Sequence, residues 1–195
     1  MPNWCDCDLS IGAVDEDKKS ITELKKFVKF AKSKDNAIDT EKFIPYPKKL
    51  RDADIKVQKV RDAHRKKQDK ANFKDMTKEE QETWIKKNPD KSWKMKDGFN
   101  NGGYDWCCKN WGTKWGICDA SLEDEDYKYG RLNYQFKSAW SPPAPVIVKM
   151  SKLFPTLTFD LRYFECGGGY NGWLSCRGGI ALENKTGDYF GNRGG

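Results

Sequence analysis

Leu132-Asn-Tyr-Gln-Phe-Lys-Ser138 and Leu157-Thr-Phe-Asp-Leu-Arg-Tyr163 are two stretches in which apolar or small residues alternate with polar ones. This period of two predicts half-buried β-strands. Between them, Ser141 followed by Pro142 predicts the start of a helix, and Pro155 predicts its end. The predicted buried face of this helix contains Val146, Ile147, Met150, Leu153 and Phe154. Residues 132–163 therefore predict a strand–helix–strand unit.

The N-terminal segment predicts another strand followed by a helix. Cys5, Cys7, Leu9 and Ile11 alternate with Asp6, Asp8 and Ser10, which indicates a strand with one buried face. After a loop from Gly12 to Lys19, the capping box Ser20-Ile-Thr-Glu23 predicts a helix that ends near Lys34. We expect its buried face to hold Ile21, Leu24, Phe27, Val28 and Ala31. A short extended piece is predicted at Lys42–Ile44.

The remaining segments complete a predicted sheet. Trp115–Ala120 is predicted to be a strand and Glu123–Asp126 an acidic turn. Gly167–Gly172 is predicted to form a hairpin turn, after which Trp173–Leu182 returns as an antiparallel strand. This order predicts an α+β fold, a ferredoxin-like βαββαβ sandwich with helices on one face of an antiparallel sheet.

Residues 48–103 interrupt this order and carry most of the net charge. Residues 56–96 contain fourteen Lys and Arg residues but only seven Asp and Glu residues. The net charge of this stretch is therefore +7, which equals the net charge of the whole chain. One helix is predicted over roughly 50–70, and a second is capped by Thr77-Lys-Glu-Glu80 and runs to about Lys87. The thin apolar stripe on the first helix consists of Ala53, Val57, Val60 and His64. We predict one domain over 1–195 with an inserted basic helical segment at 48–103.

Four Trp- or Pro-containing motifs give a family resemblance. They are Met1-Pro-Asn-Trp-Cys5, Phe43-Ile-Pro-Tyr-Pro47, Asn101-Gly-Gly-Tyr-Asp-Trp-Cys-Cys-Lys-Asn-Trp-Gly-Thr-Lys-Trp-Gly116 and Ser138-Ala-Trp-Ser-Pro-Pro143. With these motifs the chain resembles phage- and plasmid-encoded proteins that carry a YubB-type ferredoxin-like domain. The resemblance covers most of the chain except the basic segment. It implies a ferredoxin-like fold and a mobile-element origin, and it implies no particular activity.

The basic segment is the strongest functional lead. A row of cations on a helix attracts phosphates, and the interleaved aromatics Phe73, Trp84, Trp93 and Phe99 could stack on unpaired bases. Two other interpretations stay open: a solvated helical hairpin, and a surface for an acidic protein partner. The candidate residues for binding nucleic acid or a partner are Lys56, Lys59, Arg65, Lys66, Lys67, Lys70 and Lys74.

Tryptophans form a second candidate surface. Trp84, Trp93 and Trp106 are candidates for an exposed aromatic surface, whereas Trp111 and Trp140 are interpreted as core residues. The outward Asp6 and Asp8 argue against an RNA-recognition surface on the sheet, since that mode needs aromatics on the central strands. Any nucleic-acid binding is therefore expected on the inserted segment.

The sequence predicts no catalytic residue, no metal site and no cofactor. Its seven cysteines lack the paired spacing of structural zinc sites and are expected to be reduced packing residues. His64 is the single histidine, which makes a Ser-His-Asp mechanism improbable. An enzyme acting on nucleic acid stays an alternative, with Asp119 and Asp160 as metal-binding carboxylates.

Charge, apolar pattern and motifs together predict a function class. The sequence has no apolar run that could span a membrane and no signal-peptide pattern, so we expect a soluble protein of the host cytoplasm. The leading hypothesis is a non-enzymatic, mobile-element protein that engages nucleic acid or a host nucleoprotein, with inhibition of a host defence complex as one instance. A structural or assembly protein that uses its tryptophans is the third hypothesis.

Overall fold

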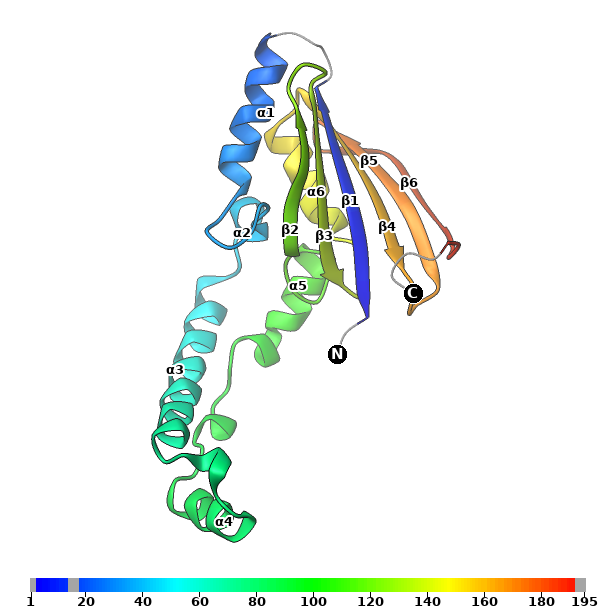
Figure 1. Ribbon diagram of the computed structural model, residues 1–195. Helices are drawn as coiled ribbons and strands as arrows, with labels where there is room; N and C mark the ends of the chain where they lie inside the picture. The colour runs from blue at the N-terminus through cyan, green and yellow to red at the C-terminus, as the bar shows by residue number, and fades with distance from the viewer. Residues whose placement is uncertain (1–2, 14–17, 192–195) are drawn as a thin grey trace. The chain divides into compact units, whose positions relative to one another are not determined.

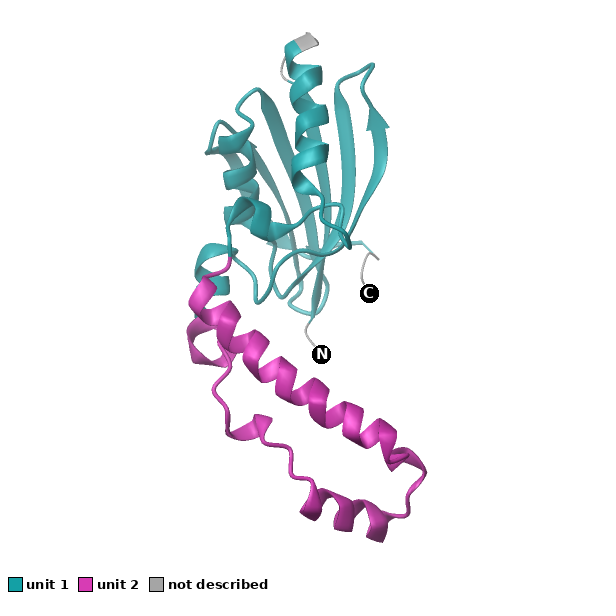
Figure 2. Ribbon diagram, turned by 90° about the vertical axis from the view of Figure 1, so that its left-hand side faces the viewer, with its two compact units in different colours: residues 1–45, 105–195 teal, residues 46–104 magenta. Residues whose placement is uncertain are grey.

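The computed structural model describes residues 3–13 and 18–191. The chain divides into two compact units, one formed by residues 1–45 and 105–195 and the other by residues 46–104 (Figure 2). We call the first the sheet unit and the second the inserted unit. None of the described helices is long and apolar enough to cross a membrane.

The sheet unit contains a six-stranded antiparallel sheet in the order β2-β3-β1-β4-β5-β6. Its helices α1 (Lys18–Ala31) and α6 (Ala144–Leu153) lie on one face of the sheet (Figures 1 and 2). The order β2-β3-β1-β4 with these two helical connections is the predicted ferredoxin-like arrangement, which is confirmed. The strands are β1 (Trp4–Ala13), β2 (Cys118–Asp126), β3 (Arg131–Ala139), β4 (Leu157–Glu165), β5 (Tyr170–Arg177) and β6 (Ile180–Asp188).

The core lies between the sheet and the two helices. The predicted inward residues of β1, namely Cys5, Cys7, Leu9 and Ile11, are all buried. Phe27 of α1 packs edge-on against Tyr134, Phe154 and Phe159 with ring centroids 5.2 to 6.0 Å apart. β1 pairs with both β3 and β4, so the buried side chains of β1 lie directly beside buried side chains of both neighbouring strands.

Two sheet segments differ from the prediction. Glu123–Asp126 is the end of β2 and not a turn; the turn follows it, where Asp126 Oδ1 accepts hydrogen bonds from the amides of Lys128 and Tyr129. Residues 173–182 are two strands and not one. Gly178 and Gly179 both have positive φ, which suits a tight turn and ends β5 before β6 begins.

Three helix boundaries also differ. In the predicted extended piece at 42–44, Ile44 is extended, but Lys42 and Phe43 belong to the short helix α2 (Thr40–Phe43), which the Asp39 side chain caps by accepting a hydrogen bond from the Glu41 amide. Helix α1 begins at Lys18 and ends at Ala31, so Ser20 is not its cap, and residues 14–17 of the predicted loop lie outside the described residues. Helix α6 is preceded by Pro143, since the Ser141 hydroxyl donates to the Gly112 carbonyl and does not cap the helix.

The inserted unit consists mainly of one long helix and a returning segment. Helix α3 (Lys48–Lys70) is followed by η1 (Phe73–Asp75), α4 (Lys78–Lys87), η2 (Ser92–Lys94) and η3 (Phe99–Gly103), and α5 (Tyr104–Asn110) leads back to the sheet unit. The predicted capping box of α4 is confirmed, with Thr77 and Glu80 bonded reciprocally. Among the residues of this unit, Val57 is the only fully buried hydrophobic side chain.

Candidate nucleic-acid interface

Five of the predicted cations form a row on α3. An α-helix turns by about 100° per residue, so Lys56, Lys59, Lys66, Lys67 and Lys70 fall within an arc of roughly 100°. All five side chains are exposed. The two acidic residues between Lys56 and Lys70, Asp62 and Asp69, fall outside this arc. We call these five residues the lysine row.

The opposite side of α3 is used for packing within the inserted unit. Asp54 accepts a hydrogen bond of 2.9 Å from the Phe99 amide, Arg61 lies 3.7 Å from Asp97, and His64 Nε2 lies 3.0 Å from the Asn88 carbonyl. These residues and Val57 occupy a different arc from the lysine row. The row therefore faces away from the returning segment, over about 21 Å of helix at 1.5 Å per residue.

Arg65 and Lys74 are placed apart from the lysine row. Arg65 contacts Asp62 at 3.2 Å, and Lys74 lies in η1, beyond the end of α3. Both line a hollow of about 560 Å³ that also includes Asp69 and Asp75. Because carboxylates share this hollow, its charge is mixed and an anion gains less there than at the lysine row.

The three candidate tryptophans have different surroundings. Trp84 packs edge-on against His64 and Phe73, with ring centroids 5.5 and 5.2 Å apart, and so fixes α4 within the inserted unit. Trp93 is 73% exposed. Trp106 belongs to the sheet unit, where its ring lies 5.3 Å from that of Trp111.

The two tryptophans predicted to be core residues behave differently. Trp111 is buried, and its indole Nε1 donates to the Ile44 carbonyl at 2.8 Å, as expected of a core residue. The prediction is wrong for Trp140, which is 48% exposed. Its φ of +71° turns the chain at the end of β3, and hydrogen bonds from its amide to Asn3 and from the Tyr170 hydroxyl to its carbonyl hold that turn.

The cysteines and carboxylates are possible nucleophiles and metal ligands among the described residues. Burial raises the pKa of the Cys7 thiol well above its ordinary value and that of Cys176 to about 11, which keeps both thiols protonated and unreactive. Within residues 3–13 and 18–191, no cluster of three His, Cys, Asp or Glu side chains could hold a metal. Asp119 and Asp160 lie on β2 and β4, which β3 and β1 separate by about 14 Å, so they cannot ligate one ion.

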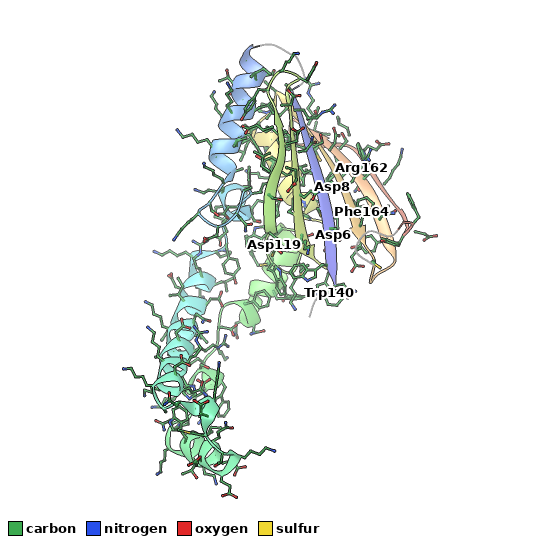
Figure 3. All side chains as sticks on the ribbon, in the orientation of Figure 1. Asp6, Asp8, Asp119, Trp140, Arg162 and Phe164 are labelled. Carbon is green, nitrogen blue, oxygen red and sulfur yellow. The ribbon has the colours of Figure 1, made fainter. Side chains whose placement is uncertain are left out.

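The helix-free face of the sheet contains residues that the sequence interpretation did not consider. Asp6 and Asp8 lie along β1 on this face, as predicted, while Arg162 and Phe164 lie along the neighbouring β4 (Figure 3). Trp173 of β5 is directly opposite Arg162. A signal was available, since Phe164 and Trp173 are large aromatics at positions where the alternation expects polar side chains.

Comparisons with known proteins give one solved structure and one family model that are similar to this chain. The crystal structure of a protein api92 from Yersinia pseudotuberculosis is similar to this chain with a TM-score of 0.49 and 11% identity, over 98% of this chain and 99% of that one. No curated protein matches the sequence. Residues 111–190 match the family model described as the ferredoxin-like domain in Api92-like protein. Over these residues, which include β2 to β6 and α6, the chain is therefore similar to the ferredoxin-like domain of Api92-like proteins.

Proposed function

We propose that this chain is a non-enzymatic binding protein whose inserted unit engages nucleic acid through the lysine row. The observation that carries the proposal is the segregation of charge on α3. Five exposed lysines share one face, and the carboxylates of the same stretch lie elsewhere. A helix that is only solvated is stabilised when Lys and Asp or Glu alternate along one face, because opposite charges three or four residues apart then attract one another. Grouping the lysines on one face gives up those pairs.

The chemistry of the row favours contacts to the phosphate backbone. Lysine ammonium groups act as point charges and lack the planar fork with which arginine reads guanine. The row contains no aromatic side chain, since Trp84 is turned inward against His64. We therefore expect binding that is insensitive to base sequence and strongly dependent on salt.

The cellular setting of this proposal rests on the resemblance to phage- and plasmid-encoded proteins. A basic, non-catalytic protein of that origin would act in the host cytoplasm on nucleic acid or on a host nucleoprotein. Inhibition of a host defence complex is one result that such binding would have. An acidic protein partner would use the same row, so the test must separate it from nucleic acid.

The test is a titration of a labelled 30-base-pair duplex, followed by fluorescence anisotropy over a series of salt concentrations. The variant is Lys66→Glu with Lys67→Glu and Lys70→Glu. A matched control reverses three exposed lysines of the same unit outside α3, namely Lys78, Lys91 and Lys96. Both variants lower the net charge equally, so a difference between them reports the position of the charges.

The plot of log K against log salt has a negative slope, and we expect its magnitude to be smaller by about 2 to 3 units in the row variant. Each lost phosphate contact removes about 0.9 from that magnitude. At low salt its affinity should fall at least tenfold, and that of the control much less. Equal slopes for parent and row variant would overturn the proposal. So would a pulldown from host lysate in which nuclease treatment leaves the captured material unchanged, because the partner would then be a protein.

A further inference from the structure

The helix-free face of the sheet has two halves of different chemistry. One half is acidic: Asp6 and Asp8 lie along β1 (Figure 3), and Asp160 lies on β4, directly opposite Ser10 of β1. The other half, formed by residues 162–164 of β4 together with β5 and β6, presents Arg162, Phe164, Trp173 and Lys185. All of these residues belong to the sheet unit, and none of them is part of the lysine row.

Strand register assembles these residues into two adjacent rows. Arg162, Trp173 and Lys185 are directly opposite one another across β4, β5 and β6, where strands lie about 4.8 Å apart. The Arg162 guanidinium carbon lies 5.1 Å from the centre of the Trp173 ring, within the range of a cation–π contact. The next row contains Phe164, Asn171 and Gly187.

Between these rows the surface is hollowed by about 470 Å³, within the size range of small-ligand sites. The lining includes Arg162, Phe164, Trp173, Lys185, Gly187 and Phe190. Gly187 leaves space, because no atom lies within 4 Å of the position that its Cβ would take. Phe190 is 76% exposed beside it.

Charge distinguishes this hollow from its neighbour. No acidic residue lines the hollow over β4–β6, although Lys185 also contacts Glu183 on its own strand. The adjoining hollow of about 460 Å³, on the other side of the Arg162–Trp173 pair, is lined by Asp8, Glu123 and Asp160 as well as arginines. An anion is therefore favoured in the first hollow relative to the second, where the lining carboxylates repel it.

We propose that the hollow over β4–β6 binds a nucleotide, with its base against the rings of Phe164 and Phe190 and its phosphate near Lys185 and Arg162. Aromatic rings beside cations are the combination that single-stranded nucleic-acid sites use, because every base has a π-face and every linkage a charge. The nucleotide is either a unit of a single strand or a free mononucleotide. This site needs no residue of the lysine row, and the two proposals can fail independently.

The experiment uses the full chain with the lysine row reversed at residues 66, 67 and 70, so that backbone binding by the inserted unit is removed. Tryptophan fluorescence and calorimetry follow titration with three probes: an eight-residue oligothymidylate, an abasic octamer with the same phosphates, and thymidine monophosphate. Further variants are Phe164→Leu, Phe164→Tyr and Arg162→Gln. Gln135→Ala, in the acidic half of the same face, is the matched control.

We expect the oligothymidylate to bind and the abasic octamer to bind at least tenfold more weakly, since stacking on aromatics supplies that difference. Phe164→Leu and Arg162→Gln should each weaken binding about tenfold, while Phe164→Tyr, which keeps the ring, and Gln135→Ala should stay within about threefold of the parent. Monophosphate binding as tight as that of the octamer would identify a free nucleotide as the ligand, and weaker binding a single strand. Equal binding of the abasic octamer, no effect of Phe164→Leu, or no binding of any probe would overturn the proposal.

Discussion

Replacing Trp111 or Trp140 with alanine should separate a core tryptophan from a surface one. Trp111 is 5% exposed, so its ring removes up to about 240 Å² from water, which is worth at most about 6 kcal/mol. Its loss also leaves the Ile44 carbonyl without its donor. Large-to-small changes in cores cost about 3–5 kcal/mol, and we expect Trp111→Ala to lie at the upper end of that range.

Trp140 is 48% exposed, and the same area estimate gives at most about 3 kcal/mol. We expect Trp140→Ala to cost about 1–2 kcal/mol, because area estimates are upper bounds. Trp140→Gly should be at least as stable as Trp140→Ala, which reverses the usual order. The reason is the φ of +71°, which is unfavourable by about 1 kcal/mol for residues with a Cβ and costs glycine nothing.

Urea unfolding followed by far-UV circular dichroism measures these differences. With a slope of about 2 kcal/mol per molar urea, Trp111→Ala should lower the midpoint by about 2 M and Trp140→Ala by less than about 1 M. The slopes must agree among variants for the midpoints to be compared. An equal shift for both alanine variants would refute the assignment of Trp140 to the surface. A glycine variant clearly less stable than the alanine variant would refute the account of its backbone.

Gly172→Ala should cost about 1–3 kcal/mol in the same assay, because its new methyl group would collide with the Tyr163 hydroxyl, while Gly187→Ala should cost less than about 0.5 kcal/mol. The pKa of Glu80 is lowered mainly by the hydrogen bond from the Thr77 amide and secondly by that from the Thr77 hydroxyl. The stability that ionised Glu80 gives to α4 is therefore fully present above the ordinary carboxyl pKa and is lost as pH falls through the lowered pKa. The protection factors of the α4 amides, which correct for the intrinsic pH dependence of exchange, should therefore fall on acidification. Glu80→Gln should remove that dependence, while Thr77→Ala, which keeps the amide donor, should only weaken it; a parent without the dependence would contradict the assignment. The triple reversal of the lysine row should leave the thermal midpoint within a degree or two by calorimetry, since exposed changes stay within about 0.5 kcal/mol, and a larger drop would mean that these lysines are structural.

Sequence alone predicts the elements that bury one face. Apolar and polar residues alternate strictly over Cys5–Ile11 and Leu157–Tyr163. A shift of either strand by one residue would bury Asp6 or Asp160, so the pattern permits one register, and the structure has it. Exposed strands carry no such constraint. Glu123–Asp126 reads as a turn by composition, yet it pairs with β3 at the sheet edge, where both side-chain faces are open to water.

The candidate interface was predictable in charge but not in arrangement. Counting lysines locates the basic segment, and the helical period then separates the lysine row from Arg65. Contacts distant in sequence are needed for the rest: Trp84 is turned inward by His64, and Trp140 is turned outward by backbone bonds to Asn3 and Tyr170. The hollow over β4–β6 depends on strand register, which brings Arg162 and Trp173 together although neither forms a motif.

The irregular pairing of β2 with β3 also bears on solubility. β2 lies at one edge of the sheet, its register shifts twice along β3, and its second half is the acidic run Glu123–Asp126. An open edge is a template on which another chain can add a strand, and both bulges and like charges oppose that addition. This edge should therefore resist stacking into aggregates at low ionic strength. Concentrated salt would screen its repulsion and leave only the bulges to keep neighbouring molecules apart.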